Sequence, residues 1–425
     1  MPGAEIQMPS VSVLREYLRA TTERIARELA SPSAEAPEWC DVQWRVAMAV
    51  AVMHGVSALL AGRLRWRGPE IWATFLARQK EQGILRQRRT QRLLAEIDAA
   101  SRQVQIPLVA LKGSVLLGLD LYAPGERPMS DVDLLCRGYD FEAAGRLIEA
   151  LGYAPGVTNW RHREYAPVDA GQDRAFGEHI ANPVKIELHG RIMERLPQRD
   201  VDITTQLFPS PAHGGLNPYP SSAALMQHLL LHAAGNMCGQ FVRLIQLHDI
   251  AALAKRMSRE DWDVLIPSGT TLRAPWWVLP PLALVNRYFP DSIPATVVDR
   301  AAAACPALLR RASGRYQLAD VSLSRLETPM LPGWEWSRSM AEVLAWAFTR
   351  LYPGRDAVAA MQRLALDQHA LVTTGWAQLP RWRKGMRILA GRAPRAGTMY
   401  SVRRALDYGP VALSAPYSSS TRVKV

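Results

Sequence analysis

Three short stretches decide how this chain folds: IPLVALKGS at residues 106–114, SDVDLL at residues 130–135 and VKIELHG at residues 184–190. The first is an apolar run that ends in glycine, and the other two alternate polar and apolar residues as half-buried strands do. Segments with a helical pattern lie between them, at residues 114–122 and 141–153. We therefore expect a small mixed β-sheet with helices over residues 105–200.

The rest of the chain has a helical pattern. Leucine, alanine and valine recur at three- and four-residue spacings before residue 105, and similar segments return after residue 200. The fold class expected is therefore α+β, a small mixed β-sheet core flanked by largely α-helical regions. We expect an N-terminal helical region, the core, a C-terminal helical domain and a basic, flexible tail, with boundaries at residues 1–104, 105–200, 201–380 and 381–425.

Composition excludes several classes of protein. Of the 425 residues 48% are hydrophobic, which is typical of a globular chain and not of a disordered one. The four cysteines are far apart and show no metal-binding spacing, which favours a reducing cytoplasm. We find no signal peptide, and the most apolar uncharged stretch, residues 46–62, contains His54, Gly55 and Ser57. We therefore expect a core helix there and no membrane partner.

Positive charge is concentrated at the C-terminus. The formal net charge is +12, and residues 381–425 contribute nine of it, with ten basic residues against the single acid Asp407. A second basic run contains Arg86, Arg88, Arg89 and Arg92. Such charge can attract nucleic acid, but a solvated basic face is the commoner reason for one run. Because no known nucleic-acid-binding motif accompanies it, nucleic acid is a possible partner that we do not favour.

The second stretch carries two acids on one face of a strand. Alternation places Asp131 and Asp133 on one side and Val132 and Leu134 on the other. Two neighbouring carboxylates repel each other unless a cation neutralises them, and hard oxygen ligands suit Mg²⁺. Glu187 joins them if its strand is a neighbour. For either motif alone, a solvated strand edge is the alternative interpretation.

The first stretch has the features of a phosphate-binding turn. Lys112, Gly113 and Ser114 lie where a strand gives way to a helix, with Ser114 as the expected N-cap. Glycine lets a phosphate approach the backbone closely there. Lys112 either contacts phosphate or lies on the surface. Arg127 can pair with nucleotide phosphates or with the aspartates.

The order of these motifs resembles a known family. The series LKGS, RPMSDVDLL and IELHG looks like the DNA polymerase β superfamily of nucleotidyltransferases, and more narrowly like its bacterial branch of uncharacterised nucleotidyltransferases. The resemblance spans about residues 49–265. It implies a glycine–serine pair that contacts the triphosphate, an aspartate pair that binds two Mg²⁺ ions, and a third acid that completes the site. These roles correspond to Gly113, Ser114, Asp131, Asp133 and Glu187.

Further residues are expected to support this site. Ser130 precedes the aspartate pair and is expected to contact the nucleotide, and Glu187 is the best candidate to help deprotonate the acceptor. His189, on the same strand face, either orients the acceptor or is a packed, hydrogen-bonded histidine. His228 and His232 have a spacing that can hold a metal, but no third ligand is evident, so we expect them in the interior or the cleft. Arg243 is a further candidate around the site.

The expected activity is Mg²⁺-dependent transfer of a nucleoside monophosphate from an NTP, with two metal ions. By the resemblance, the acceptor is a peptide, a sugar or another small molecule, and the protein is an accessory enzyme of a biosynthetic cluster. One alternative is nucleotidyl transfer directed to RNA or protein; the RNA version predicts salt-sensitive binding that truncation after Pro380 removes. The other is a non-catalytic nucleotide-binding module.

Overall fold

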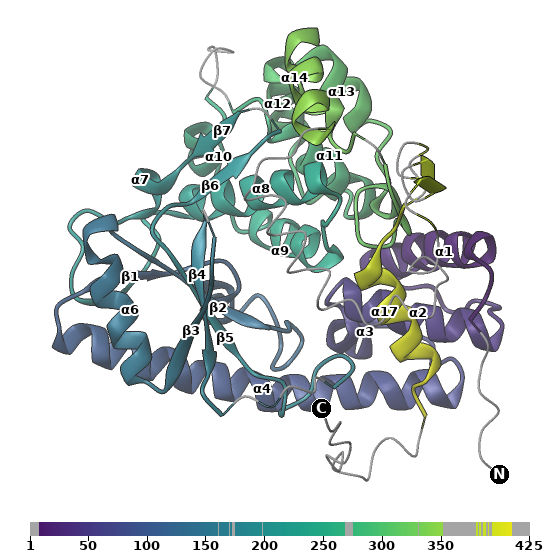
Figure 1. Cartoon of the computed structure of the whole chain (residues 1–425), viewed down its shortest axis with the longest axis horizontal. Coiled ribbons are helices and arrows are strands. Elements are labelled where there is room, and N and C mark those ends of the chain that lie inside the picture. The colour runs from purple at the N-terminus through teal and green to yellow at the C-terminus, as the bar shows by residue number, and fades with distance from the viewer. Residues whose placement is uncertain are drawn as a thin grey trace.

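The structure is a computed structural model of the chain. It describes residues 8–159, 161–169, 171, 175–197, 199–267, 275–329, 331–351, 380, 382–383, 386–387, 390 and 393–409. The fold is α+β, as expected, with a mixed sheet among helices (Figure 1).

The N-terminal region is helical. Its helices are α1 (Val11–Ala30), α2 (Asp41–Met53), α3 (Ser57–Arg63) and α4 (Glu70–Gln103). Helix α1 starts at Ser10, whose side chain accepts a hydrogen bond from the Val13 N–H. Helix α4 has 34 residues, and its buried positions recur every three or four residues. It runs beneath both the sheet and the other N-terminal helices (Figure 1) and joins the two parts of the molecule.

The sheet has the strand order β3-β4-β5-β2-β1-β8 among the described residues. Its strands and connecting helices are β1 (Pro107–Ala110), α5 (Gly113–Leu116), β2 (Asp131–Cys136), α6 (Phe141–Ala150), β3 (Tyr153–Thr158), β4 (His162–Pro167), β5 (Lys185–His189) and β8 (Gly215–Asn217). Strand β2 pairs parallel to β5 and antiparallel to β1. Strand β8 lies beyond the expected core boundary at residue 200 and pairs parallel to β1. A separate two-stranded sheet joins β6 (Met193–Arg195) and β7 (Asp200–Asp202).

The two faces of the sheet belong to different cores. Val132, Leu134, Ile186 and Leu188 are fully buried in one cluster with residues of α4 and α6. Leu135, on the opposite face of β2, belongs to a second cluster that holds both the N-terminal and the C-terminal helices. The polar residues of β2 and β5 therefore lie between the sheet and the helical part of the molecule.

The C-terminal half is mostly helical. The structure has α7 (Thr204–Leu207), α8 (Ser222–Gly239), α9 (Leu244–Ala254), α10 (Arg259–Leu265), α11 (Leu279–Tyr288), α12 (Ala295–Ala304), α13 (Ala307–Ser313), α14 (Met340–Leu351) and α17 (Ala396–Leu406), with short 3₁₀ turns at η1 (Leu117–Leu119), η2 (Gly138–Asp140), η3 (Leu318–Asp320) and η4 (Trp334–Trp336) and a two-residue pair of β9 (Glu327–Thr328) with β10 (Ala393–Pro394).

Part of the predicted flexible tail belongs to the core. Met399, Val402, Ala405 and Leu406 of α17 are buried in the cluster that holds α2, and Arg395 is buried with its guanidinium on the Gln240 carbonyl. The expectation of a loose tail does not hold for residues 393–409, because apolar side chains there recur at helical spacing. Residues 410–425 lie outside the described part of the chain.

No single helix among the described residues combines the length and apolar character needed to cross a membrane. Only α2 and α3 taken together meet that test by length and composition, and they bend by 110° where they join. The helix expected within residues 46–62 is thus two helices, with Gly55 at positive φ at the break. Their side chains are largely buried in the core.

Candidate active site

The two acidic strands are direct neighbours. In the parallel ladder of β2 and β5, Asp133 lies opposite Glu187 and Asp131 lies opposite Lys185. Partners in a ladder point to the same face, so Asp131, Asp133 and Glu187 share the face that looks toward the helices. The structure thus brings the three predicted acids together on one sheet face.

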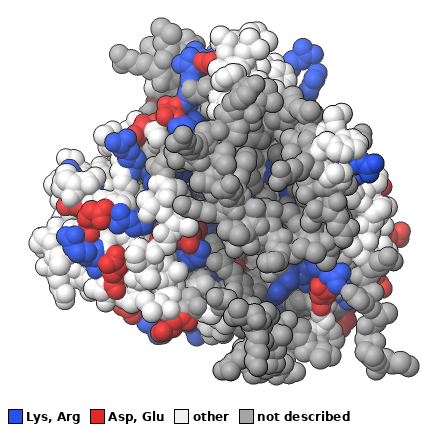
Figure 2. Space-filling view, in the orientation of Figure 1, with Lys and Arg blue, Asp and Glu red and all other residues white. Residues whose placement is uncertain are grey.

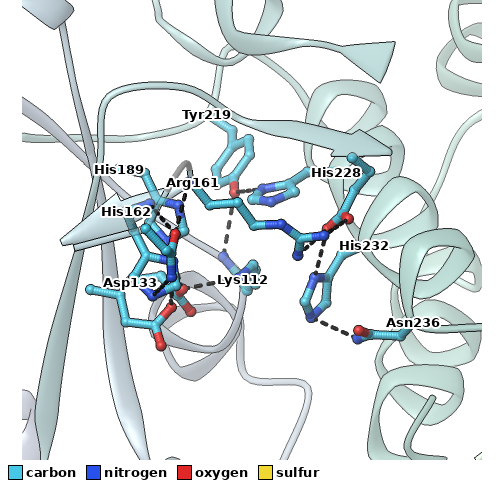
Figure 3. Close-up of polar contacts among 12 residues, drawn as sticks. Lys112, Asp133, Arg161, His162, His189, Tyr219, His228, His232 and Asn236 are labelled. Atoms are coloured by element: carbon cyan, nitrogen blue, oxygen red, sulfur yellow. Dashed lines mark hydrogen bonds and ion pairs between the residues drawn. The ribbon is translucent and has the colours of Figure 1, made fainter. Parts of the chain in front are cut away.

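Asp133 is the most enclosed of the three acids. Its Oδ1 lies 3.0 Å from the Lys112 Nζ and 3.1 Å from the His189 Nε2, and both partners point toward it in Figure 3. Burial alone would raise the pKa of Asp133, but these partners hold that pKa well below its ordinary value. Asp133 is therefore a buried, ionised carboxylate. Lys112 is not a surface residue, since its side chain is 16% exposed.

Asp131 has the opposite electrostatic environment. Burial, followed by the negative charges of Asp133 and Glu187, raises the pKa of Asp131 to about 6. Lys112 and Arg243 counteract only part of this effect. A carboxylate that is this costly to ionise gains most from a bound cation.

A histidine that the sequence did not single out completes the face. Strand β4 pairs with β5 so that His162 lies opposite His189, and the His162 Nδ1 lies 3.5 Å from the Glu187 Oε2. The His189 Nε2 lies 3.6 Å from the same oxygen. His162, Glu187 and His189 each place one ligand atom within 4.8 Å of the others, so they could hold a metal ion. Only the pairing of β4 reveals His162, because β4 carried no recognised strand signal.

The glycine turn is tightly packed. A Cβ on Gly113 would lie 2.2 Å from the Arg127 Nη1, so only glycine fits without displacing that guanidinium. Lys112 precedes α5 with φ +46° and ψ −116°. Ser114 is the second residue of α5, so its expected role as N-cap is wrong. The Ser114 hydroxyl is buried and has no hydrogen-bond partner within the described part of the chain.

Arg127 pairs with Asp249 and not with the aspartates of β2. It donates two hydrogen bonds to buried Asp249 of α9, at 2.9 and 2.7 Å, and the Tyr122 hydroxyl donates a third at 2.6 Å. The Arg127 guanidinium, held in this way, packs against Gly113. Ser130 is exposed, and its carbonyl accepts a hydrogen bond from the Lys185 N–H.

Tyr219, which precedes α8, connects Lys112 to His228 of that helix. The Tyr219 hydroxyl accepts a hydrogen bond from the Lys112 N–H at 3.3 Å and lies 2.7 Å from the His228 Nδ1 (Figure 3). Burial holds the pKa of His228 well below its ordinary value, so the neutral ring accepts a hydrogen bond from the Tyr219 hydroxyl. Tyr219 is a site residue that no sequence motif indicated.

The other two predicted supporting residues face different neighbours. His232 lies 3.1 Å from the Asn236 amide and 3.6 Å from Glu194, whose carboxylate is paired with Arg161. His228 and His232 therefore have different polar neighbours. Arg243 donates from Nε to the Met53 carbonyl at 3.1 Å, and the negative charge of Asp131 acts on it.

The tripeptide Asp-Val-Asp occurs a second time, at residues 200–202. There it forms β7 in the small sheet, where both aspartates are exposed. Asp200 pairs with the exposed Arg195, and Asp202 accepts hydrogen bonds from Thr204. The same local sequence thus lies in the acidic site at one position and on the surface at the other.

The comparisons with known proteins agree with this geometry. The family model described as "Uncharacterised nucleotidyltransferase" matches residues 41–290, which is more than half of the chain. Neither the curated proteins nor the solved structures include a match. A match of this extent, over a sheet that carries three neighbouring acids beside a glycine turn, shows that the chain belongs to the uncharacterised nucleotidyltransferase family and is a transferase enzyme.

Proposed function

We propose that the protein transfers a nucleoside monophosphate from an NTP to a non-polymeric acceptor, with Mg²⁺, as the DNA polymerase β superfamily does. The acceptor class is a peptide, a sugar or another small molecule, and the role is that of an accessory enzyme of a biosynthetic cluster. The observation that carries the proposal is the pairing of Asp133 with Glu187 on one sheet face, with Asp131 on that same face. The free state of all four cysteines supports a cytoplasmic location.

The donor set fits a hard divalent cation. Asp131, Asp133 and Glu187 offer carboxylate oxygens, the ligands that Mg²⁺ prefers. The raised pKa of Asp131, which arises from burial and from the other two acids, reflects negative charge that the protein alone does not neutralise. A bound divalent ion would polarise the phosphate and stabilise the leaving pyrophosphate.

The turn before α5 is suited to the triphosphate. Gly113 has no side chain where the turn packs against Arg127, and the buried Ser114 hydroxyl lacks a partner within the described residues. A phosphate oxygen would satisfy that hydroxyl and so remove the cost of an unpaired buried polar group. Lys112 places a positive charge beside the same turn.

The transfer step requires the acceptor to lose a proton. A bond forms between the acceptor oxygen and the α-phosphorus, and the bond from the α-phosphorus to the bridging oxygen breaks to release pyrophosphate. Glu187 accepts the proton. Burial is the largest effect and would raise the pKa of Glu187, but His189, His162 and Lys112 together lower this pKa below its ordinary value, so the carboxylate is ionised and ready to act as a base.

The RNA-directed alternative gains no support from Arg86 and Arg89 of the basic run, or from the described residues on the face drawn in Figure 2. Arg86 of the basic run is buried against Glu178, and Arg89 donates to the Ile180 carbonyl. On the face drawn in Figure 2, the described basic and acidic side chains are interspersed and form no continuous basic patch.

The test is a labelling experiment with the full chain. The protein is incubated with Mg²⁺, each α-³²P-labelled NTP in turn, and extract of the host as the source of acceptor. We expect one labelled product class, and we expect Asp133→Asn to reduce labelling at least about 100-fold, because a carboxylate that would bind the divalent ion is lost.

The second Asp-Val-Asp provides a matched control. Asp200→Asn makes the same chemical change in the same tripeptide on the surface, and labelling should remain at the wild-type level. Equal labelling by wild type and Asp133→Asn would reject the proposed site. Absence of labelling with every NTP in wild type would reject the activity itself.

A further inference from the structure

Lys112 is a permanent cation inside the acidic site. Its Nζ lies 3.0 Å from the Asp133 Oδ1, and the two side chains are only 16% and 10% exposed. The charges of Glu187 and Asp131 also act favourably on this ammonium group. One positive charge of the chain itself therefore lies beside Asp133 (Figure 3), and the other two carboxylates act on it as well.

The backbone at Lys112 is held in an unfavourable conformation. Its φ of +46° and ψ of −116° lie where residues with a side chain are rare, and glycine would adopt this conformation more readily. The Lys112 N–H is fixed by Tyr219, which is in turn bonded to His228. A strained lysine that its surroundings hold in place indicates that the side chain has a function there.

The Lys112 ammonium occupies the part of Asp133 that a metal would use. The Asp133 Oδ1 already receives Lys112 at 3.0 Å and His189 at 3.1 Å. An Mg²⁺ ion on that oxygen, at a bond length of roughly 2.0–2.1 Å, would lie close to the ammonium and repel it. The lysine and a metal ion therefore compete for this oxygen.

We propose that the Lys112 ammonium takes the place of one of the two divalent ions that the resemblance to the superfamily implies. The site then holds a single divalent ion, bound by Asp131, Glu187 and the remaining oxygen of Asp133. Three carboxylates are balanced by one lysine and one divalent ion. This inference rests on the proposed function, because it concerns the metal content of the same site.

The test counts ions and does not depend on turnover. Mn²⁺ is titrated into the metal-free full chain and followed by electron paramagnetic resonance, for wild type and Lys112→Met. Wild type should bind one ion at the site. In Lys112→Met we expect a second ion, or at least tenfold tighter binding of the first, because the competing charge is gone. Lys255→Met, which removes the same charge from an exposed position, should match wild type.

A purely structural role of Lys112 predicts that the Mn²⁺ affinity changes in the opposite direction. If Lys112 only held Asp133 in position, its removal would weaken Mn²⁺ binding, and that result would overturn the inference. Two ions in wild type, or equal binding by wild type and Lys112→Met, would also overturn it while leaving the proposed function intact. Absence of Mn²⁺ binding in both chains would reject the metal site, and with it the proposed function.

Discussion

Two aspartates that are two residues apart should affect stability in opposite directions. The pKa of Asp131 is raised from 3.8 to about 6 by burial and then by Asp133 and Glu187. An acid whose pKa is raised by folding is easier to ionise in the unfolded chain, so its ionisation at neutral pH favours unfolding. A shift of about two pKa units corresponds to about 3 kcal/mol. Asp131→Asn should therefore stabilise the metal-free protein by about 3 kcal/mol at pH 7.5.

The pH dependence has a defined direction. The destabilisation caused by Asp131 is fully present above pH 6, and it fades as the pH falls toward 3.8, the pKa of this group in the unfolded chain. The advantage of Asp131→Asn should accordingly shrink to about 1 kcal/mol at pH 4.5. Urea denaturation in EDTA at the two pH values measures both differences.

Asp133→Asn should be destabilising under the same conditions. Asp133 has a pKa well below its ordinary value, and its loss leaves the buried Lys112 without its carboxylate partner. Breaking a buried ion pair in this way costs about 3–5 kcal/mol. Asp200→Asn, at the exposed copy of the tripeptide, should change the free energy of unfolding by less than about 0.5 kcal/mol. Destabilisation by Asp131→Asn at pH 7.5, or an effect that does not change with pH, would refute the reasoning.

Two other predictions concern the support of the glycine turn. Arg127→Met removes both hydrogen bonds to buried Asp249 and should lower the free energy of unfolding, measured in urea, by about 3–5 kcal/mol. Arg67→Met, which breaks the exposed pair with Glu70, should lower it by less than about 1 kcal/mol. Similar losses in the two variants would contradict the supporting role of Arg127. Gly113→Ala would place a Cβ 2.2 Å from the Arg127 Nη1 and should destabilise the chain by about 1–3 kcal/mol in thermal denaturation, whereas Gly118→Ala, with no heavy atom within 4 Å, should be nearly neutral. Equal melting temperatures for the two glycine variants would show that the turn can accommodate the added methyl group, against this prediction.

The local pattern predicted the elements and the faces of the site. Alternation along residues 130–135 and 184–190 places acids on one face and apolar residues on the other, and the structure has β2 and β5 there with Val132 and Ile186 in the core. A strand's period of two is a property of the backbone, so it can be read from sequence. The same holds for the helical spacing of the flanking regions.

Only the tertiary structure decided which groups meet. The two Asp-Val-Asp tripeptides are identical, yet one contacts a lysine and a histidine and the other faces solvent, because strand pairing and not local sequence sets the neighbours. The pairing of β4 supplies His162, the return of the chain from α9 gives Arg127 its partner Asp249, and the turn before α5 aims Lys112 at Asp133. These contacts join residues 21 to 122 positions apart, and their energies depend on burial that exists only in the folded chain.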